Sequence, residues 1–268
     1  MTLAVDLRGS RELLLNLTLR EIRGKYKRTV LGQVWSLLNP VAQLATYALV
    51  FGTILLNHPA PGDPSGVDVF VVWLATGLIP WLFFANVVTS GMGALIGNAN
   101  LIQKVYFPRS SLVISAALAL LFTSSIEMGV VLVLCLAFGG SPLLYLPATI
   151  FFMLMLFCLG LGISFMLSVA NVYFRDTQHF VSILMQIWFY ATPILYPITT
   201  IAGRYPHLVP WVRANPIERF TEIFRDTLYN GRWPTLIDSA IVTGVSLVVL
   251  VIGYAVFMKF EGRLAEEL

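Results

Sequence analysis

The side chains that most often carry out covalent chemistry are few and scattered in this sequence. The histidines His58, His179 and His207 are far apart, and Cys135 and Cys158 lie in apolar stretches, where a thiol usually acts as a small packing residue. The sequence has no G-x-x-x-x-G-K-[ST] loop to cradle the phosphates of a nucleotide, and no clustered carboxylates spaced for a metal ion. We therefore predict no catalytic site, no metal site and no bound cofactor in this chain.

Glu127 is the one acidic residue deep inside a long apolar stretch. An ionisable residue in such a position often marks a pathway through a helix bundle or pairs with another polar group inside it. The neighbouring hydroxyls of Ser124 and Ser125 are equally compatible with a second role, in which a protonated or hydrogen-bonded Glu127 holds helices together. Both roles stay open from the sequence.

The amino-acid composition is that of a membrane protein. Apolar residues make up 57% of the 268 residues and charged residues only 12%, and the mean hydropathy is +0.81. Soluble domains average about 25% charged residues. A helix needs ~20 apolar residues to cross the ~30 Å hydrocarbon core of a bilayer. We therefore predict an all-α integral membrane protein with six transmembrane helices, at about residues 34–57, 67–90, 111–138, 145–169, 180–198 and 236–258.

The six spans form a single transmembrane domain, residues 34–258, and leave residues 1–33 and 259–268 on the same side of the membrane. If that side is the cytoplasm, twelve of the 17 cations are cytoplasmic, and the first two outside loops contain none. The positive-inside rule therefore predicts that both termini are cytoplasmic and that the protein lies in the cytoplasmic (inner) membrane.

An amphipathic pattern occurs within residues 1–33. Ser10 can cap a helix in which Leu15, Leu19 and Ile22 recur at helical spacing. We expect this helix to lie along the membrane surface, because its apolar stripe would otherwise be exposed to water.

Four cations, Arg23, Lys25, Lys27 and Arg28, come shortly before the first span. They could attract an anionic headgroup by charge. They could also act only as topological signals that hold the N-terminus in the cytoplasm, and the sequence somewhat favours this second role.

The stretch NANLIQKVYFPR, residues 98–109, is a short polar break between two long apolar runs. Lys104 and Arg109 are interleaved with apolar and aromatic side chains, and Pro108 ends any preceding helix. A connector between spans needs only a few polar residues. The apolar side chains therefore indicate either a docking surface or a short helix on the lipid headgroups, and the sequence supports the two equally.

Residues 201–233 form a long outside segment that contains a further helix. It begins at Asn215-Pro216, with Asn215 as the cap and Glu218 placed to reach back to it. Its apolar face comprises Ile217, Phe220, Phe224 and Leu228, and its polar face comprises Arg219, Glu222, Arg225 and Asp226. We expect a helical hairpin that lies flat on the membrane or dips between the spans as a re-entrant element.

Four stretches together resemble the membrane subunits of type-2 ABC exporters for polysaccharides, such as the O-antigen, teichoic-acid and cell-wall galactan exporters. They are LREIRGKYKRTVLGQVWSLLNP (19–40), NANLIQKVYFPR (98–109), VYFRDTQH (172–179) and NPIERFTEIFRDTLYNGRWP (215–234). The resemblance covers essentially the whole chain, with the four motifs in the order and topology of that family.

The resemblance implies a half-transporter that exports a lipid-linked polysaccharide, carried on a polyprenyl diphosphate or similar anchor. Two copies of the chain would form the channel within the membrane lipids, and two separate subunits would bind ATP and Mg. No nucleic acid is expected as a partner. Stretch 98–109 resembles the helix that couples the channel to the ATPase. The implied coupling residues are Asn98, Leu101, Ile102, Lys104, Val105, Tyr106, Phe107, Arg175 and Asp176.

A path for a glycan can use aromatic side chains, because the apolar faces of sugars stack on them. Tryptophans and tyrosines near span ends are more often interfacial anchors, and for any single residue here that role is favoured. The candidates for the substrate path are Arg23, Lys25, Lys27, Arg28, Trp73, Trp81, Phe83, Phe84, Glu127, Trp188, Phe189, Tyr190 and Tyr196.

Other functions compete with this hypothesis. A drug or small-lipid exporter of the same superfamily would share the topology, but the basic N-terminal helix and the outside hairpin favour glycans. A membrane enzyme acting on polyprenyl phosphates would need acidic or basic residues clustered at one face, which the sequence lacks. A channel-like structural protein is a weaker alternative.

Overall fold

The computed structural model describes residues 11–24, 29–32, 34–55, 59–105, 107–264 and 267. Helices joined by short loops make up these residues, and no β-strand occurs among them. The predicted all-α integral membrane fold is confirmed, because five helical segments of this part are long and apolar enough to cross a membrane. They are α3–η1 (Val34–Ile54), α4 (Phe70–Gly97), α6 (Ser110–Ala137), η2–α7 (Pro142–Tyr173) and α12 (Leu236–Phe260).

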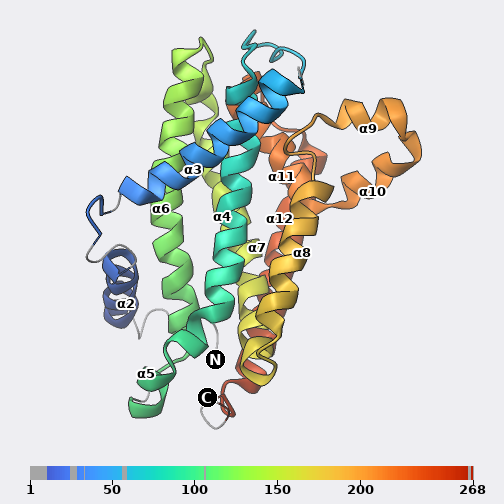
Figure 1. The fold of residues 1–268 in the computed structure, drawn as a ribbon. Helices are drawn as coiled ribbons and strands as arrows, with labels where there is room; N and C mark the ends of the chain where they lie inside the picture. Colours follow the sequence, from blue (N-terminus) through green and yellow to red (C-terminus); the bar gives the residue numbers. More distant parts are fainter. Residues whose placement is uncertain are drawn as a thin grey trace.

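Shorter helices lie beside the bundle and at its two ends (Figure 1). One end, called here the α5 end, holds α5 (Ala99–Lys104) and the start of α8 (Thr177–Ala191). The α2 helix (Arg11–Gly24) packs on α6. The opposite end, called the hairpin end, holds the loop before α4 and a chain of short helices. These are α9 (Ile198–Arg204), η3 (Pro206–Leu208), α10 (Val209–Ala214), α11 (Pro216–Phe224) and η4 (Arg225–Asn230).

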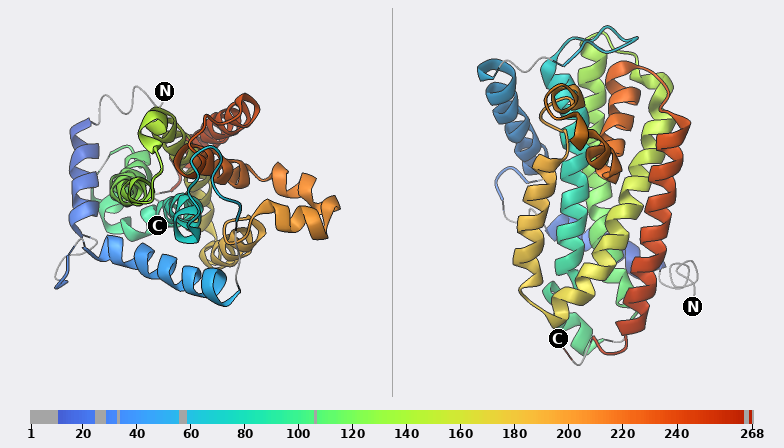
Figure 2. Two further views of the ribbon diagram at one scale, coloured as in Figure 1. Left: turned by 90° about the horizontal axis from the view of Figure 1, so that it is seen from above. Right: turned by 90° about the vertical axis from the view of Figure 1, so that its right-hand side faces the viewer.

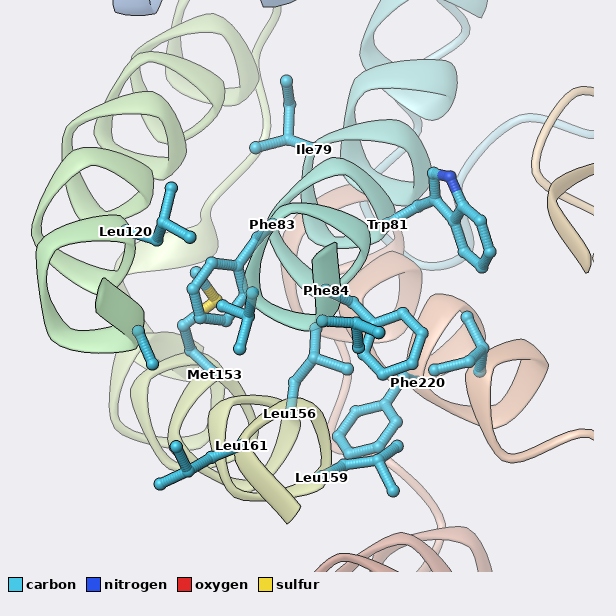
Figure 3. Packing of buried hydrophobic residues seen from close by; sticks show 14 of the residues in the cluster. Ile79, Trp81, Phe83, Phe84, Leu120, Met153, Leu156, Leu159, Leu161 and Phe220 are labelled. Atoms are coloured by element: carbon cyan, nitrogen blue, oxygen red, sulfur yellow. The ribbon is translucent and has the colours of Figure 1, made fainter. Parts of the chain in front are cut away.

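The α4 helix lies at the centre of the bundle, between α6 and α7 (Figures 1 and 2). Every residue from Val72 to Trp81 is buried. A helix that is apolar on all sides is expected to be buried in this way. In Figure 3, Phe83 points toward Met153 of α7, whereas Trp81 points to the opposite side of α4. The α4 helix therefore contributes some side chains to the packing against α7 and others to the opposite side of the helix (Figure 3).

Small residues allow the helix backbones to approach each other closely. A Cβ added at Gly253 of α12 would overlap the carbonyl oxygen of Gly162 on α7, and one added at Gly162 would lie 2.5 Å from the Val249 carbonyl oxygen. Between α7 and α4, the Ser164 hydroxyl donates a hydrogen bond to the Val87 carbonyl at 2.9 Å. Close backbone contact and interhelical hydrogen bonds are the main sources of helix association in a membrane.

The first span takes a different position from the other four. The α3–η1 segment crosses the side of the bundle obliquely (Figures 1 and 2), and only 6% of its most apolar stretch is buried. Large exposed side chains on it are Val34, Trp35, Leu38, Val41 and Leu49. This apolar surface can contact lipid or another protein chain.

Several spans have limits that differ from those predicted. The α4 helix continues to Gly97, beyond the predicted end at residue 90. The span predicted at residues 180–198 corresponds to α8, which ends at Ala191 because Pro193 and Pro197 lack the N–H group that a continuing helix requires. At 15 residues, α8 is shorter than the other spans, although it packs against α4 (Figure 1). The count of six spans therefore stays a prediction.

We expect Gly253→Ala to destabilise the protein by about 1–3 kcal/mol, because the new methyl group would force α12 away from α7. Gly244→Ala on the same helix is the matched control, since a Cβ there meets no heavy atom within 4 Å. Thermal unfolding of the two purified variants in detergent measures the difference. Equal unfolding temperatures would show that the α7–α12 contact is not as close as described.

Candidate functional site

A crevice of about 210 Å³ lies on one side of the bundle, between α3, α4 and α8. Its lining combines aromatic rings, aliphatic side chains and two amides. The lining residues are Gln43, Tyr47, Leu78, Trp81, Leu82, Ala85, Met185, Gln186 and Phe189. Since α3, α4 and α8 are far apart in the sequence, only the fold brings these side chains together.

The aromatic rings of the crevice contact one another. The centroid of the Phe189 ring lies 5.7 Å from that of Tyr47 and 5.7 Å from that of Trp81. Trp188, which does not line the crevice, contacts the ring of Trp81, and its indole N–H donates to the Asn215 side-chain oxygen at 3.0 Å. These contacts fix the orientation of the rings.

The chemistry of the crevice suits a neutral ligand that has both apolar faces and hydroxyl groups. Aromatic rings offer a flat apolar surface, and the exposed amides of Gln43 and Gln186 can each donate and accept hydrogen bonds. Ligand sites commonly combine an apolar wall with a few polar groups in this way. The sequence analysis missed Gln43, Tyr47 and Gln186, although an amide within an apolar span was a usable signal.

The structure separates the residues predicted for the substrate path. Trp81 and Phe189 line the crevice. Tyr190 is exposed, and its carbonyl accepts a hydrogen bond from the Tyr196 hydroxyl at 2.8 Å. Glu127 lines a separate, narrow crevice between α3 and α6. The side chains of Trp73, Phe83 and Phe84 are packed inside the chain.

The cations predicted for the path lie mostly outside the described part of the chain. Arg23 is exposed in the last turn of α2. Lys25, Lys27 and Arg28 lie outside the described residues.

The predicted coupling segment forms the short helix α5, which projects at one end of the bundle (Figure 1). Asn98 is at its N-cap, but its side chain does not cap the helix. The amide instead donates to the Ala94 carbonyl at 2.9 Å and accepts a hydrogen bond from Arg20 of α2 at 2.5 Å. This contact ties α5 to the α2 helix.

The side chains of α5 and of the residues that follow it divide into an inner and an outer set. Ile102 is buried, and Leu101 and Phe107 are half-buried. Lys104 and Val105 are exposed, Val105 with 52% of its surface. Tyr106, also predicted to couple, lies outside the described residues. The exposed set leaves a mixed apolar and cationic surface free at this end of the bundle.

Other contacts at the α5 end link distant parts of the chain. The backbone N–H of Arg109 donates to the Glu261 carboxylate at 2.8 Å, and the Arg109 guanidinium donates to the Glu261 carbonyl. The segment after α5 is thereby bound to the turn that follows α12. Arg175 and Asp176 are exposed just before α8, at the same end (Figure 1).

At the hairpin end, α11 begins as predicted but with different cap chemistry. The Asn215 side-chain oxygen accepts a hydrogen bond from the Ile217 N–H at 3.0 Å. The predicted contact of Glu218 back to Asn215 is wrong, because the Asn215 N–H already donates to the Val212 carbonyl. The Glu218 side chain is fully buried, and neither carboxylate oxygen has a hydrogen-bond partner among the described residues.

The predicted polar face of this helix is also wrong in part. Arg225 and Asp226 are buried, with exposed fractions of 3% and 6%. Asp226 accepts hydrogen bonds from Asn230 and Arg232, both at 2.8 Å. These two residues therefore hold the hairpin together and do not face solvent.

Membrane-crossing helices, a crevice between three of them and a short projecting helix at one end are compatible with a membrane transport subunit. Residues 12–229 match the family model of the ABC-2 type transporters, and the chain belongs to that family. It is a permease, a component of a transport system and not an enzyme.

Curated relatives are similar over nearly the whole chain. The O-antigen export system permease protein RfbA of Myxococcus xanthus is 30% identical over 258 residues, which are 96% of this chain and 96% of that protein. RfbA of Klebsiella pneumoniae is 30% identical over 95% of this chain and 94% of that protein. The polysialic acid transport protein KpsM of Escherichia coli is 28% identical over 91% of this chain and 92% of that protein.

Glu218 is expected to make the stability depend on pH. The pKa of Glu218 is raised from 4.5 to about 7, chiefly by burial and also by the nearby charges of Glu222 and Asp238, while Arg213 and Arg219 act to lower it. Because the folded-state pKa is the higher one, the protonated carboxyl contributes stability that is fully present below about pH 4.5 and is lost as the pH rises through about 7.

Glu218→Gln should therefore raise the unfolding temperature at about pH 8 and leave it nearly unchanged at about pH 5. The gain in the free energy of unfolding at about pH 8 should be up to ~3 kcal/mol. Glu12→Gln on the exposed face of α2 is the control. Thermal unfolding in detergent at both pH values checks the expectation. An equal effect of Glu218→Gln at the two pH values would contradict it.

Proposed function

We propose that this chain is the membrane subunit of an ATP-driven exporter that moves a lipid-linked polysaccharide from the cytoplasmic to the outer side of the membrane. The similarity to polysaccharide-export permeases along nearly the whole chain carries the proposal. The aromatic and amide lining of the crevice supports it, since sugars present both apolar faces and hydroxyl groups. A polyprenyl diphosphate or similar lipid would anchor the glycan.

In this proposal the α5 end faces the cytoplasm and the membrane is the cytoplasmic (inner) one. The cations of the segments assigned to that side outnumber those of the other side, as the positive-inside rule requires. Both termini are then cytoplasmic. The glycan enters near the α5 end and leaves at the hairpin end.

The proposed transporter contains two copies of this chain and two ATP-binding subunits, which hold ATP and Mg. The sequence has no nucleotide-binding loop of its own. The exposed side chains of Lys104, at the end of α5, and of Val105, which follows it, form a surface for the ATPase, and Arg175 and Asp176 extend it. A second copy placed against α3 would cover its exposed apolar face.

The proposed function is tested by reconstituting the chain with its ATPase subunit in vesicles. Lipid-linked glycan on the cytoplasmic face should reach the opposite face only with ATP, as followed by an impermeant lectin. A complex whose ATPase cannot hydrolyse ATP is the control. A complex that hydrolyses ATP without moving any lipid-linked glycan would overturn the proposal.

Docking of α5 on the ATPase is tested by Val105→Asp. A carboxylate placed in an apolar contact should lower glycan-stimulated ATP hydrolysis by about tenfold, which corresponds to ~1.4 kcal/mol of binding. Val30→Asp is the matched control, because Val30 is fully exposed in the segment between α2 and α3. ATPase rates are normalised to the amount of inserted permease. Equal rates for the two variants would exclude Val105 from the contact.

A further inference from the structure

A single buried side chain at the hairpin end, that of Arg225, contacts three separate segments. Its guanidinium carbon lies 3.7 Å from the centroid of the Trp73 ring in the first turn of α4. One nitrogen donates to the Glu222 carboxylate at 3.1 Å, and another donates to the Ile194 carbonyl at 3.1 Å. Arg225 thereby joins η4, α4 and the segment that follows α8.

The segments that Arg225 joins continue from two walls of the crevice. Gly77 comes directly before the crevice residue Leu78 on α4, and Trp73 lies about one helical turn before Gly77. Ile194 follows the crevice residue Phe189, after α8 has ended. At the hairpin end, α4 and the segment after α8 are therefore linked by the Arg225 guanidinium, in addition to the packing of Ile194 near Gly77.

The packing leaves little freedom for this guanidinium. A Cβ added at Gly77 would lie 3.3 Å from an Arg225 nitrogen and 3.1 Å from a methyl group of Thr221. A glycine at position 77 therefore lets α4 come this close without displacing these two side chains. A buried cation is stable only while its partners stay in place. Removal of the Trp73 or Ile194 contact would leave a buried charge poorly compensated.

Other hydrogen bonds attach the helical hairpin of α11 and η4 to the loop before α4 and to the segment after α8. The contacts of Arg225 can therefore change without unfolding the hairpin. Ser65 in the loop before α4 donates its hydroxyl to the Tyr229 carbonyl at 2.5 Å. At the other end of α11, the Asn215 amide donates to the Thr192 hydroxyl at 2.9 Å. The segment after α8 is thus attached to the hairpin at Asn215 even when the Ile194 contact is broken.

We propose that Arg225 is a positioning residue that holds the outer end of the crevice closed, and that export requires its guanidinium to leave the Ile194 carbonyl so that α4 and the segment after α8 can separate. We call the contacts of Arg225 with Trp73 and Ile194 the Arg225 clamp. The role of the Arg225 clamp in export rests on the proposed function. The effect of the clamp on access to the crevice can be measured without any substrate.

The test measures access to the crevice from the outer side. Gln186→Cys, in a chain that also carries Cys135→Ala and Cys158→Ala, places one thiol in the crevice. The permease is assembled with its ATPase subunit in membranes without nucleotide, and a membrane-impermeant maleimide is added on the outer face. The labelling rate reports how far the outer end of the crevice is open.

Two clamp variants and one matched control decide the outcome. Arg225→Lys keeps the charge but loses the planar contact with Trp73, and Gly77→Ala places a methyl group in tight contact with the guanidinium and with Thr221. Both should raise the labelling rate several-fold. Gly93→Ala, on the same helix with no heavy atom within 4 Å of the new Cβ, should leave the rate unchanged. If Arg225→Lys does not assemble, Gly77→Ala carries the test.

Labelling rates of the clamp variants equal to that of the parent would overturn the inference. A second readout is the amount of glycan exported per ATP hydrolysed, which should fall in the clamp variants and not in Gly93→Ala. If the parent exports no glycan but labelling still responds to the clamp variants, the proposed function fails and the clamp stands. If export occurs and labelling does not respond, the clamp fails and the proposed function stands.

Discussion

Polar groups inside a membrane protein must find their partners within the protein, because the hydrocarbon core offers no hydrogen bonds. In this chain the partners converge on and around α4. Ser164 of α7 bonds to the Val87 carbonyl and Asn171 of α7 to the Met92 carbonyl, while the Arg225 guanidinium lies over Trp73. Close approach of the backbones makes these contacts geometrically feasible. The position of α4 between α6 and α7 is thus the condition on which the other contacts depend.

The same helix connects the two ends of the molecule. With 28 residues, α4 is ~42 Å long at 1.5 Å per residue. Its first turns carry Trp73, which contacts Arg225, and its last residue precedes Asn98, which contacts Arg20 of α2. A displacement of α5 by an ATP-binding subunit would therefore act directly on the helix that also forms one wall of the crevice. Pro80, in the middle of α4, is the point at which such a helix bends most easily.

Local patterns in the sequence were sufficient for the helical membrane fold, the short helix at Asn98 and the start of α11 at Asn215-Pro216. They could not show which side of α4 faces the crevice, because that helix is apolar on every side and has no amphipathic period. The burial of Arg225 was missed for a related reason. Helical periodicity placed it on a polar face, and its aromatic partner Trp73 lies far away in the sequence. Contacts between segments that are distant in the sequence determine both which side of α4 faces the crevice and whether Arg225 is buried.

Along the proposed path, charged side chains that could bind the anionic lipid anchor lie apart from the neutral side chains that could contact the sugars. The described residues that line the crevice include none with a charge. Exposed cations lie outside it, with Arg23 on α2 and with Arg204 and Arg213 near the hairpin end. A cationic side chain in the apolar crevice would bind the anionic diphosphate tightly and would slow the release of the substrate. A neutral aromatic wall contacts each sugar weakly and in the same way, so a long glycan can pass it without a preferred stopping point. The separation of cations from aromatic rings therefore suits a substrate that is charged at one end and repetitive along its length.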